Sequence, residues 1–243
     1  MLKMAHAAVQ GRGHKLKNSP CQDKTYTLTK NGVSVIALAD GAGSCKHSDV
    51  GATIVVETVC KVIAARFDII YNTPTISREY LVNYIQLALY RKAEEISAKF
   101  KDLSATFLFA AVKGEQFLAG HIGDGVIGCL ATDGRLEVIS KPENGEFANE
   151  TYFVTSSQAI FRFRGYRGTI NQKKGFILMS DGAGDSLYDV QNAALAEANR
   201  GIIEWVATQT DEIKASKALK ENLEKVIVPR TNDDCSIAVM TII

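Results

Sequence analysis

The sequence lacks the features that mark exported, zinc-binding or membrane-spanning proteins. Its five cysteines are odd in number and include no CxxC pair or other zinc-binding spacing, which indicates reduced thiols. The first residues contain no apolar segment long enough for a signal peptide, and no run elsewhere approaches the length of a membrane span. We therefore expect a cytoplasmic protein with no membrane partner.

An excess of charge of either sign is also missing. Lys and Arg together number 28 against 27 for Asp and Glu, so the formal net charge is +1. This balance argues against a broad electrostatic surface for nucleic acid or anionic lipid, although it allows a local basic patch. The remaining composition, 46% apolar and 23% charged, is that of an ordinary globular protein. We expect no nucleic-acid partner.

What the sequence does contain is an aspartate that recurs next to predicted strands. An apolar run that ends abruptly in a carboxylate and small residues is typical of a buried strand that delivers the carboxylate to the rim of a sheet. Four apolar runs adjoin such an aspartate: 33–39 with Asp40, 176–179 with Asp181, 117–122 with Asp124, and 235–240 with Asp233.

These aspartates require a cation if the strand ends converge. Two carboxylates about 4 Å apart repel each other by roughly 4 kcal/mol at an effective dielectric near 20. Oxygen ligands of this kind suit hard ions such as Mg²⁺ or Mn²⁺ rather than zinc. Taken singly, each Asp-Gly pair is more commonly a turn with local hydrogen bonds, but the repetition at four strand ends favours a metal site.

The order of predicted elements indicates an α+β fold. Strands at 24–29 and 33–39 flank a favoured Asn-Gly hairpin turn at Asn31, which should bring Asp23 back beside Asp40. Further segments are a strand at 3–9, a loop at 11–23 that is rich in turn formers, a helix with Ser48 as its N-cap, and a second helix that starts near Ser77. An antiparallel meander follows at 105–112, 116–122 and 126–131, then an irregular excursion at 141–175 that carries Asn144-Gly145, helical material at 193–224, and a last strand at 235–242. This order suits two antiparallel sheets packed together with helices outside.

Five motifs in one order resemble the metal-dependent serine/threonine protein phosphatases of type 2C, in particular their compact bacterial branch. They are Pro20-Cys21-Gln22-Asp23, Ala39-Asp40-Gly41-Ala42-Gly43-Ser44, Gly123-Asp124-Gly125, Ser180-Asp181-Gly182 and Asn232-Asp233-Asp234-Cys235-Ser236-Ile237. The resemblance spans essentially the whole chain. It implies a single domain over residues 1–243, built as a four-layer α-β-β-α sandwich.

The resemblance also implies a binuclear Mn²⁺ or Mg²⁺ centre in which Asp40 bridges both ions. The Gly41 carbonyl would join the second ion, Asp181 and Asp233 would hold the first, and Asp23 would act through water. Asp124, together with Asp181, matches a weaker third metal site of the family. The implied reaction is direct attack of activated water on phosphoserine or phosphothreonine, so we expect a phosphorylated protein, a kinase target or a kinase, as substrate and a monomeric enzyme.

Two departures from the family pattern bear on the chemistry. Asn18 stands where the family often has an arginine that holds the phosphate, so His14, Lys17 or Arg12 must substitute. Ala42 stands where eukaryotic members carry a histidine that is a candidate general acid, which leaves water or His47 as proton donors. A lone histidine in a polar loop is more often solvated than catalytic, and His121 within a strand is expected to be structural.

The segment 161–167 alternates phenylalanine and arginine. We expect a hairpin with inward phenylalanines and solvated arginines, lying as a flap beside the metal cleft, where the arginines could also contact substrate. Two rivals to the leading hypothesis remain at this point: a catalytically weak phosphoprotein-binding module, and a phosphatase of a small phosphorylated metabolite.

Overall fold

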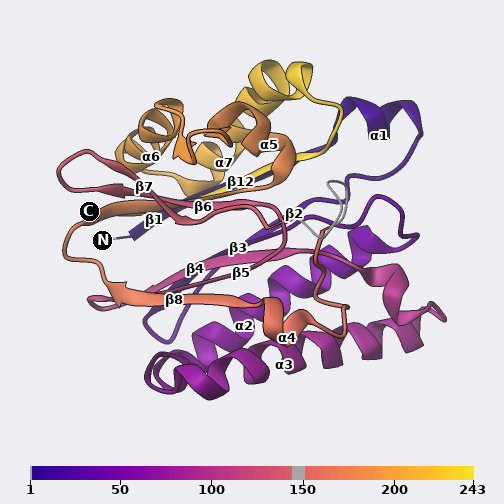
Figure 1. The fold of residues 1–243 in the computed structure, drawn as a ribbon. Helices are drawn as coiled ribbons and strands as arrows, with labels where there is room; N and C mark the ends of the chain where they lie inside the picture. The colour runs from indigo at the N-terminus through magenta and orange to yellow at the C-terminus, as the bar shows by residue number, and fades with distance from the viewer. Residues whose placement is uncertain (1, 144–150) are drawn as a thin grey trace.

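A computed structural model describes residues 2–143 and 151–243, which form two five-stranded antiparallel sheets between two helical layers (Figure 1). This arrangement confirms the predicted α-β-β-α sandwich. The first sheet has the order β2 (Lys24–Lys30), β3 (Val33–Ala39), β4 (Phe107–Lys113), β5 (Gln116–Ile122) and β8 (Arg164–Thr169). The second has the order β1 (Leu2–Val9), β12 (Cys235–Ile242), β9 (Lys173–Met179), β6 (Val126–Ala131) and β7 (Leu136–Ser140).

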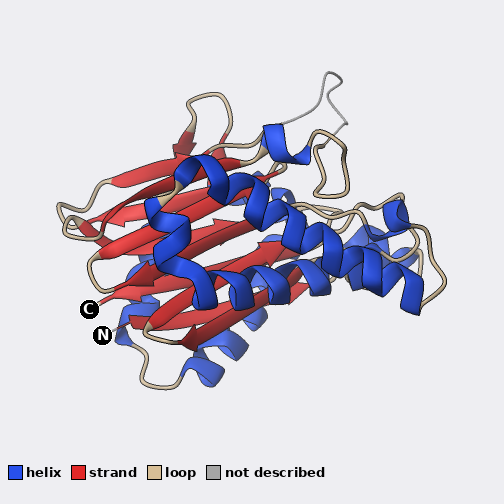
Figure 2. Ribbon diagram, turned by 90° about the horizontal axis from the view of Figure 1, so that it is seen from below, coloured by secondary structure: helices blue, strands red, loops and turns tan. Residues whose placement is uncertain are grey.

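Long helices cover the outer face of each sheet. On the first sheet lie α2 (Ser48–Asn72) and α3 (Pro74–Glu95), seen in front of the strands in Figure 2. On the second lie α5 (Asp181–Leu187), α6 (Ala198–Thr208) and α7 (Glu212–Asn222), continued by a π-helical turn (Leu223–Ile227) and a 3₁₀ turn (Val228–Arg230). The short elements are α1 (Arg12–Leu16), the 3₁₀ helix η1 (Phe100–Leu103), α4 (Ala159–Arg162), β10 (Tyr188–Asp189) and β11 (Ala194–Leu195).

Strand β3 shows why its sequence is an unbroken apolar run. Successive side chains of a strand point to opposite faces of the sheet. Val35 and Ala37 pack toward the helical layer of α2, whereas Ile36 and Leu38 enter the core between the two sheets. Every residue of β3 is buried because both of its faces are covered.

The hairpin of β2 and β3 is formed as the sequence predicted. Asn31 and Gly32 have φ values of 55° and 72°, the conformation that a two-residue type I′ turn requires. The register pairs Lys24 with Ala39, so Asp23 and Asp40 follow as neighbours at the open end of the hairpin. The prediction that the hairpin brings these two aspartates together is confirmed.

The predicted three-stranded meander is wrong at its last strand. Strands β4 and β5 pair as expected, but β6 crosses to the other sheet and pairs with β7 and β9. Gly123, with φ of 120°, permits this change of direction, which a residue with a side chain would strain. The segment Gly123-Asp124-Gly125 therefore connects the two sheets at the rim of the sandwich instead of closing a hairpin.

The start of α2 differs slightly from the prediction. Ser48 was expected to be the N-cap, but it is the first helical residue, and His47 occupies the capping position without a side-chain hydrogen bond. The Ser48 hydroxyl donates to the Cys45 carbonyl at 3.3 Å. Helix α3 begins at Pro74, three residues before Ser77, because proline is well suited to the first turn of a helix.

The excursion at 141–175 contains more regular structure than predicted. Instead of a hairpin, residues 159–169 form α4 and the edge strand β8, which pairs with β5. Phe163 is buried, but Phe161 is 80% exposed, so only one of the two phenylalanines points inward. The Asn144-Gly145 pair of this excursion lies outside the described residues. Among the helices that the structure describes, none is both long and apolar enough to cross a membrane.

Candidate metal centre

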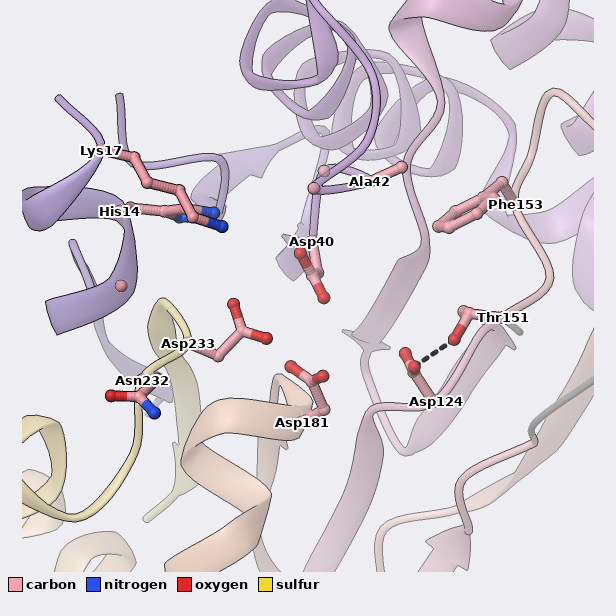
Figure 3. A pocket seen from close by; sticks show the side chains of 13 residues that line it. His14, Lys17, Asp40, Ala42, Asp124, Thr151, Phe153, Asp181, Asn232 and Asp233 are labelled. Atoms are coloured by element: carbon pink, nitrogen blue, oxygen red, sulfur yellow. Dashed lines mark hydrogen bonds between the residues drawn. The ribbon is translucent and has the colours of Figure 1, made fainter. Parts of the chain in front are cut away.

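Four aspartates from four separate chain segments line one cavity at the end of the sandwich. The cavity has a volume of about 490 Å³. Figure 3 shows Asp40, Asp124, Asp181 and Asp233 pointing toward one another across it. The remaining lining residues are Gly13, His14, Lys17, Gly41, Ala42, Gly43, Thr151, Phe153 and Asn232.

Each aspartate is delivered to this cavity by a buried strand. Asp40 directly follows β3, Asp124 lies in the crossing from β5 to β6, and Asp181 is the first residue of α5, just after β9. Asp233 precedes β12, which lies beside β9 in the second sheet. These strands pack against one another in the apolar core between the two sheets. The core therefore fixes the positions of the carboxylates, although the aspartates themselves lie outside it.

Burial, with the mutual repulsion of the carboxylates added to it, raises the pKa values of the clustered aspartates. Burial, followed by the charges of Asp23, Asp181, Asp124 and Asp233, raises the pKa of Asp40 well above its ordinary value. Burial and the charges of Asp124, Asp233 and Asp23 raise the pKa of Asp181 to about 8. The pKa of Asp124 is also raised, chiefly by burial. In the metal-free protein these groups are therefore costly to ionise, and a bound cation would relieve that cost.

Asp23 lies behind the cavity and does not line it. It is only 1% exposed, and one carboxylate oxygen accepts a hydrogen bond from the Ser236 hydroxyl at 2.7 Å. The other oxygen has no hydrogen-bond partner, and burial raises the pKa of the group to about 6. A buried, half-satisfied carboxylate next to Asp40 fits the predicted role of a ligand that acts through water.

Asp234 is a residue whose role sequence reasoning missed. It is 1% exposed, and its carboxylate accepts hydrogen bonds from the backbone N–H groups of Gly11 and Gln22, both at 2.6 Å. Its Oδ2 atom also lies 2.8 Å from His14 Nδ1. The signal was present in the sequence, because adjacent residues entering a strand face opposite sides, so Asp233 and Asp234 could not both reach the cavity.

Helix α1 brings two cationic or protonatable side chains to the cavity. The expected loop at 11–23 contains this helix, which packs on the segment before β12: Gly13 N donates to the Asn232 carbonyl at 2.8 Å. A Cβ at Gly11 would lie 2.1 Å from the Asp233 carbonyl oxygen, so only glycine allows this approach. Figure 3 shows His14 and Lys17 extending from α1 toward the carboxylates.

The other proposed cations and histidines lie elsewhere. Arg12 is exposed and donates to the Pro229 carbonyl at 2.9 Å. His47 does not line the cavity. Its backbone N–H donates a hydrogen bond to the Asp102 carbonyl. His121 is fully buried, as expected for a structural residue, and its Nδ1 lies 2.9 Å from the Ser140 hydroxyl.

The donor set fits a hard divalent cation. No group of three or more His, Cys, Asp or Glu side chains in the described part of the chain is already arranged around a single ion position. The carboxylates instead surround the cavity in an open arrangement (Figure 3). Buried Asp124 Oδ1 has no hydrogen-bond partner, whereas Oδ2 accepts one from the Thr151 hydroxyl. An all-oxygen site with an unpartnered carboxylate oxygen suits Mg²⁺ or Mn²⁺.

The arginines of the 161–167 segment are engaged within the protein. Arg162 Nη1 lies 3.1 Å from Glu143 Oε1, and the Arg162 guanidinium stacks over the Tyr152 ring at 4.0 Å. Arg164 Nε lies 3.4 Å from Glu143 Oε2, and its Nη2 donates to the Gly123 carbonyl at 3.1 Å. The predicted solvated face is therefore wrong for Arg162 and Arg164, because these side chains tie residue 143 to the crossing that carries Asp124, whereas Arg167 is exposed as predicted.

Arg164→Ala is expected to weaken both folding and the cavity. The change removes the bond to Gly123 and leaves Glu143 with one partner fewer, which should lower the free energy of unfolding by about 2 kcal/mol. Because Asp124 would be displaced, kcat/KM should fall by similar factors for an aryl phosphate and for a phosphopeptide. Urea unfolding and parallel kinetics measure both effects. Arg91→Ala, at an exposed arginine of α3, is the control, and equal unfolding free energies for the two variants would contradict the assignment.

The fold and the site together define a metal-dependent phosphoric monoester hydrolase of the kind that the sequence motifs resemble. A family model described as Protein phosphatase 2C matches residues 10–224. The chain belongs to the protein phosphatase 2C family, which confirms the predicted relationship. The match ends before Asp233, so the last carboxylate is placed by the structure and not by the family model.

Individual relatives agree with the family. Serine/threonine-protein phosphatase 3 of Escherichia coli (strain K12) is 25% identical over 175 residues, which cover 69% of this chain and 68% of that protein. The structure of serine/threonine phosphatase Stp1 from Staphylococcus aureus superposes with a TM-score of 0.66 at 15% identity, covering 100% of this chain and 96% of that one. The structure of RsbX in complex with magnesium superposes with a TM-score of 0.58 at 13% sequence identity, covering 99% of this chain and 94% of that one. These structural likenesses establish the fold.

Proposed function

We propose that the protein hydrolyses phosphoserine and phosphothreonine in other proteins with the help of two Mn²⁺ or Mg²⁺ ions, and that a third ion binds at Asp124. The observation that carries the proposal is the convergence of Asp40, Asp124, Asp181 and Asp233 on one cavity. The family membership and the magnesium complex of the structural relative support it. A dephosphorylating enzyme of this kind acts on a kinase target or on a kinase.

The residues take the following parts in this proposal. Asp40 would be shared by two ions, the Gly41 carbonyl would join the second, Asp181 and Asp233 would hold the first, and Asp23 would act through water from behind. When bound, such ions lower the pKa of water and neutralise phosphoryl oxygens. The protein itself holds the carboxylates in place, because each is anchored to a buried strand.

The arginine that often holds the phosphate in this family is replaced here by Asn18. We assign its phosphate-binding role to His14, assisted by Lys17. The buried Asp234 carboxylate lies 2.8 Å from His14 Nδ1 and holds the ring at the edge of the cavity, which His14 lines (Figure 3). Lys17 adds a positive charge on the same side. His14 and Lys17 thus supply the phosphate contacts that Asn18 cannot make, from four residues and one residue earlier in the chain.

His14→Ala is expected to raise KM for an aryl phosphate and the inhibition constant of inorganic phosphate, each by about tenfold, which is about 1.4 kcal/mol of binding. The thermal stability should change little, since the ring is partly exposed. The matched control is Arg12→Ala on the same helix, where the side chain points to Pro229. An unchanged phosphate inhibition constant in His14→Ala would assign the phosphate to other residues.

Turnover of an aryl phosphate and of a phosphothreonine peptide, with Mn²⁺ and then with a chelator, tests the proposed function. Metal-dependent release of phosphate from both substrates is the expected result. Absence of metal-dependent turnover with either would favour a phosphoprotein-binding module, and turnover of small phosphate esters alone would favour a metabolite phosphatase.

The cellular setting and assembly also belong to this proposal. All five cysteines are unpaired in the structure, which suits a reducing compartment such as the cytoplasm. We propose a monomer that acts as one domain over residues 1–243.

A further inference from the structure

A second cavity adjoins the metal centre and is not needed for the chemistry there. It has a volume of about 530 Å³, within the usual range of ligand pockets. We call it the flanking groove. It is lined by Gln86, Tyr90, Phe100, Lys101, Ser104, Thr151, Tyr152, Phe153, Thr155, Ser156 and Ser157. Thr151 and Phe153 also line the metal cavity, so the two cavities share a wall (Figure 3).

The shared wall is part of the sheet framework. Ala105 forms an isolated antiparallel bridge with Gly41 of the metal cavity. On its other side, the Ala105 carbonyl accepts a hydrogen bond from Val154 N at 2.9 Å. The Ser104 and Thr155 hydroxyls, both in the groove, lie 2.6 Å apart. The groove is therefore held at a fixed position relative to Asp40.

The groove has a chemical character unlike that of the metal cavity. Its walls carry aromatic rings, of which Tyr90 and Phe100 stack with centroids 3.9 Å apart and planes within 6°. Tyr90 nonetheless remains 52% exposed. The lining contains no carboxylate, and its charged member is Lys101. No ion pair among the described residues uses the Lys101 ammonium group, which leaves it available to a ligand.

We propose that the flanking groove binds the substrate segment next to the phosphorylated residue and selects a large aromatic side chain accompanied by an acidic one. This inference rests on the proposed function. An extended peptide advances about 3.3 Å per residue, so a side chain one to three positions from the phosphoresidue reaches an adjoining pocket. An aromatic ring there stacks on the half-exposed Tyr90, and a carboxylate pairs with Lys101 while avoiding the acidic metal cavity.

Phosphothreonine peptides on the wild-type enzyme provide the first test. A phenylalanine is moved through the three positions on each side of the phosphothreonine in an otherwise alanine-rich peptide, and kcat/KM is compared with that of the all-alanine peptide. One position on one side should raise kcat/KM by about tenfold, and an added aspartate nearby should raise it further. No preference at any position would overturn the proposal.

Variants locate the preference in the groove. Tyr90→Ala should lower the ratio of kcat/KM for the preferred peptide to that for an aryl phosphate by about tenfold. The control Tyr84→Ala, at a tyrosine of α3 outside the groove that is 46% exposed against 52% for Tyr90, should leave the ratio unchanged. Lys101→Glu should replace the preference for aspartate by one for lysine. An unchanged ratio in Tyr90→Ala together with an unchanged charge preference in Lys101→Glu would overturn the proposal.

The two proposals fail in different ways. Loss of metal-dependent aryl phosphate turnover in the wild type would contradict the phosphatase function itself. Normal aryl phosphate turnover without selectivity among peptides would contradict only the flanking groove.

Discussion

Asp40→Asn is expected to abolish turnover at ordinary Mn²⁺ concentrations while leaving the metal-free protein as stable as wild type or slightly more stable. Removing a residue that only supports a metal ligand typically costs about 10–100-fold in metal affinity or activity. Loss of a carboxylate shared by two ions should therefore exceed a hundredfold.

The stability effect has the opposite sign because Asp40 is a member of a repelling cluster. Burial and the charges of Asp23, Asp181, Asp124 and Asp233 oppose its ionisation. Asparagine has nearly the same shape and carries no charge, so the substitution relieves this repulsion. The hydrogen bonds that anchor residue 40, from its N–H to Thr106 Oγ1 and from Thr106 N to its carbonyl, use the backbone and survive.

Metal-dependent thermal shifts and turnover, measured on one preparation of each protein, decide this prediction. Added Mn²⁺ should raise the melting temperature of the wild type, because an ion that binds only the folded protein stabilises it. It should raise the melting temperature of Asp40→Asn little. Asp133→Asn, at an exposed turn, is the matched control and should respond to Mn²⁺ as wild type does. An active Asp40→Asn protein that is still stabilised by Mn²⁺ would be incompatible with a shared ligand.

The strand that carries Asp40 could be predicted because the residues that determine it are neighbours in the sequence. An apolar run, an Asn-Gly turn and the two-residue period of a strand suffice to define the β2–β3 hairpin and to place Asp23 next to Asp40. The crossing at Gly123 could not be predicted in the same way. A glycine with positive φ serves equally in a tight hairpin and in a change of sheet, and the choice depends on β9, which lies fifty residues later in the chain.

The candidate site was predictable in its carboxylates but not in its supporting residues. Asp181 and Asp233 follow recognisable motifs, whereas the contact between Asp234 and His14 joins residues at opposite ends of the chain. Likewise, Arg164 alternates with phenylalanine in the sequence, yet its partners come from the crossing and from residue 143. Such contacts depend on tertiary packing that no local pattern encodes.

The metal-free protein is expected to lose stability as the pH rises toward 8, and Mn²⁺ should remove that loss. The pKa of Asp181 is raised from 3.8 to about 8, and that of Asp23 from 3.8 to about 6. Between the ordinary value and the raised one, the folded protein binds more protons than the unfolded chain. The free energy of unfolding therefore falls with rising pH across this interval.

Two histidines, buried His121 and partly buried His6, act in the opposite direction over the lower part of the interval. Burial lowers the pKa of His6, and burial together with the Arg164 charge lowers that of His121. Below about 6.5 the unfolded chain protonates these rings more than the folded protein does, so their contribution raises stability as the pH approaches that value. Above it they are neutral in both states. The decline caused by the carboxylates should therefore be clearest between about pH 6.5 and 8.

Denaturant unfolding at several pH values, with chelator and then with Mn²⁺, measures this effect. Since one pKa unit corresponds to about 1.4 kcal/mol, the chelated protein should lose on the order of 2 kcal/mol between pH 6.5 and 8. Ionised carboxylates bind metal better than protonated ones, so the stabilisation by Mn²⁺ should grow over the same interval. Asp181→Asn should make the chelated profile shallower, with the remaining slope due to Asp40, whose pKa is also raised, whereas Asp133→Asn should leave the profile unchanged. A chelated wild-type profile that is flat from pH 6.5 to 8 would show that Asp181 is ionised without a cation, and the carboxylates would then have no need of a metal to offset their repulsion.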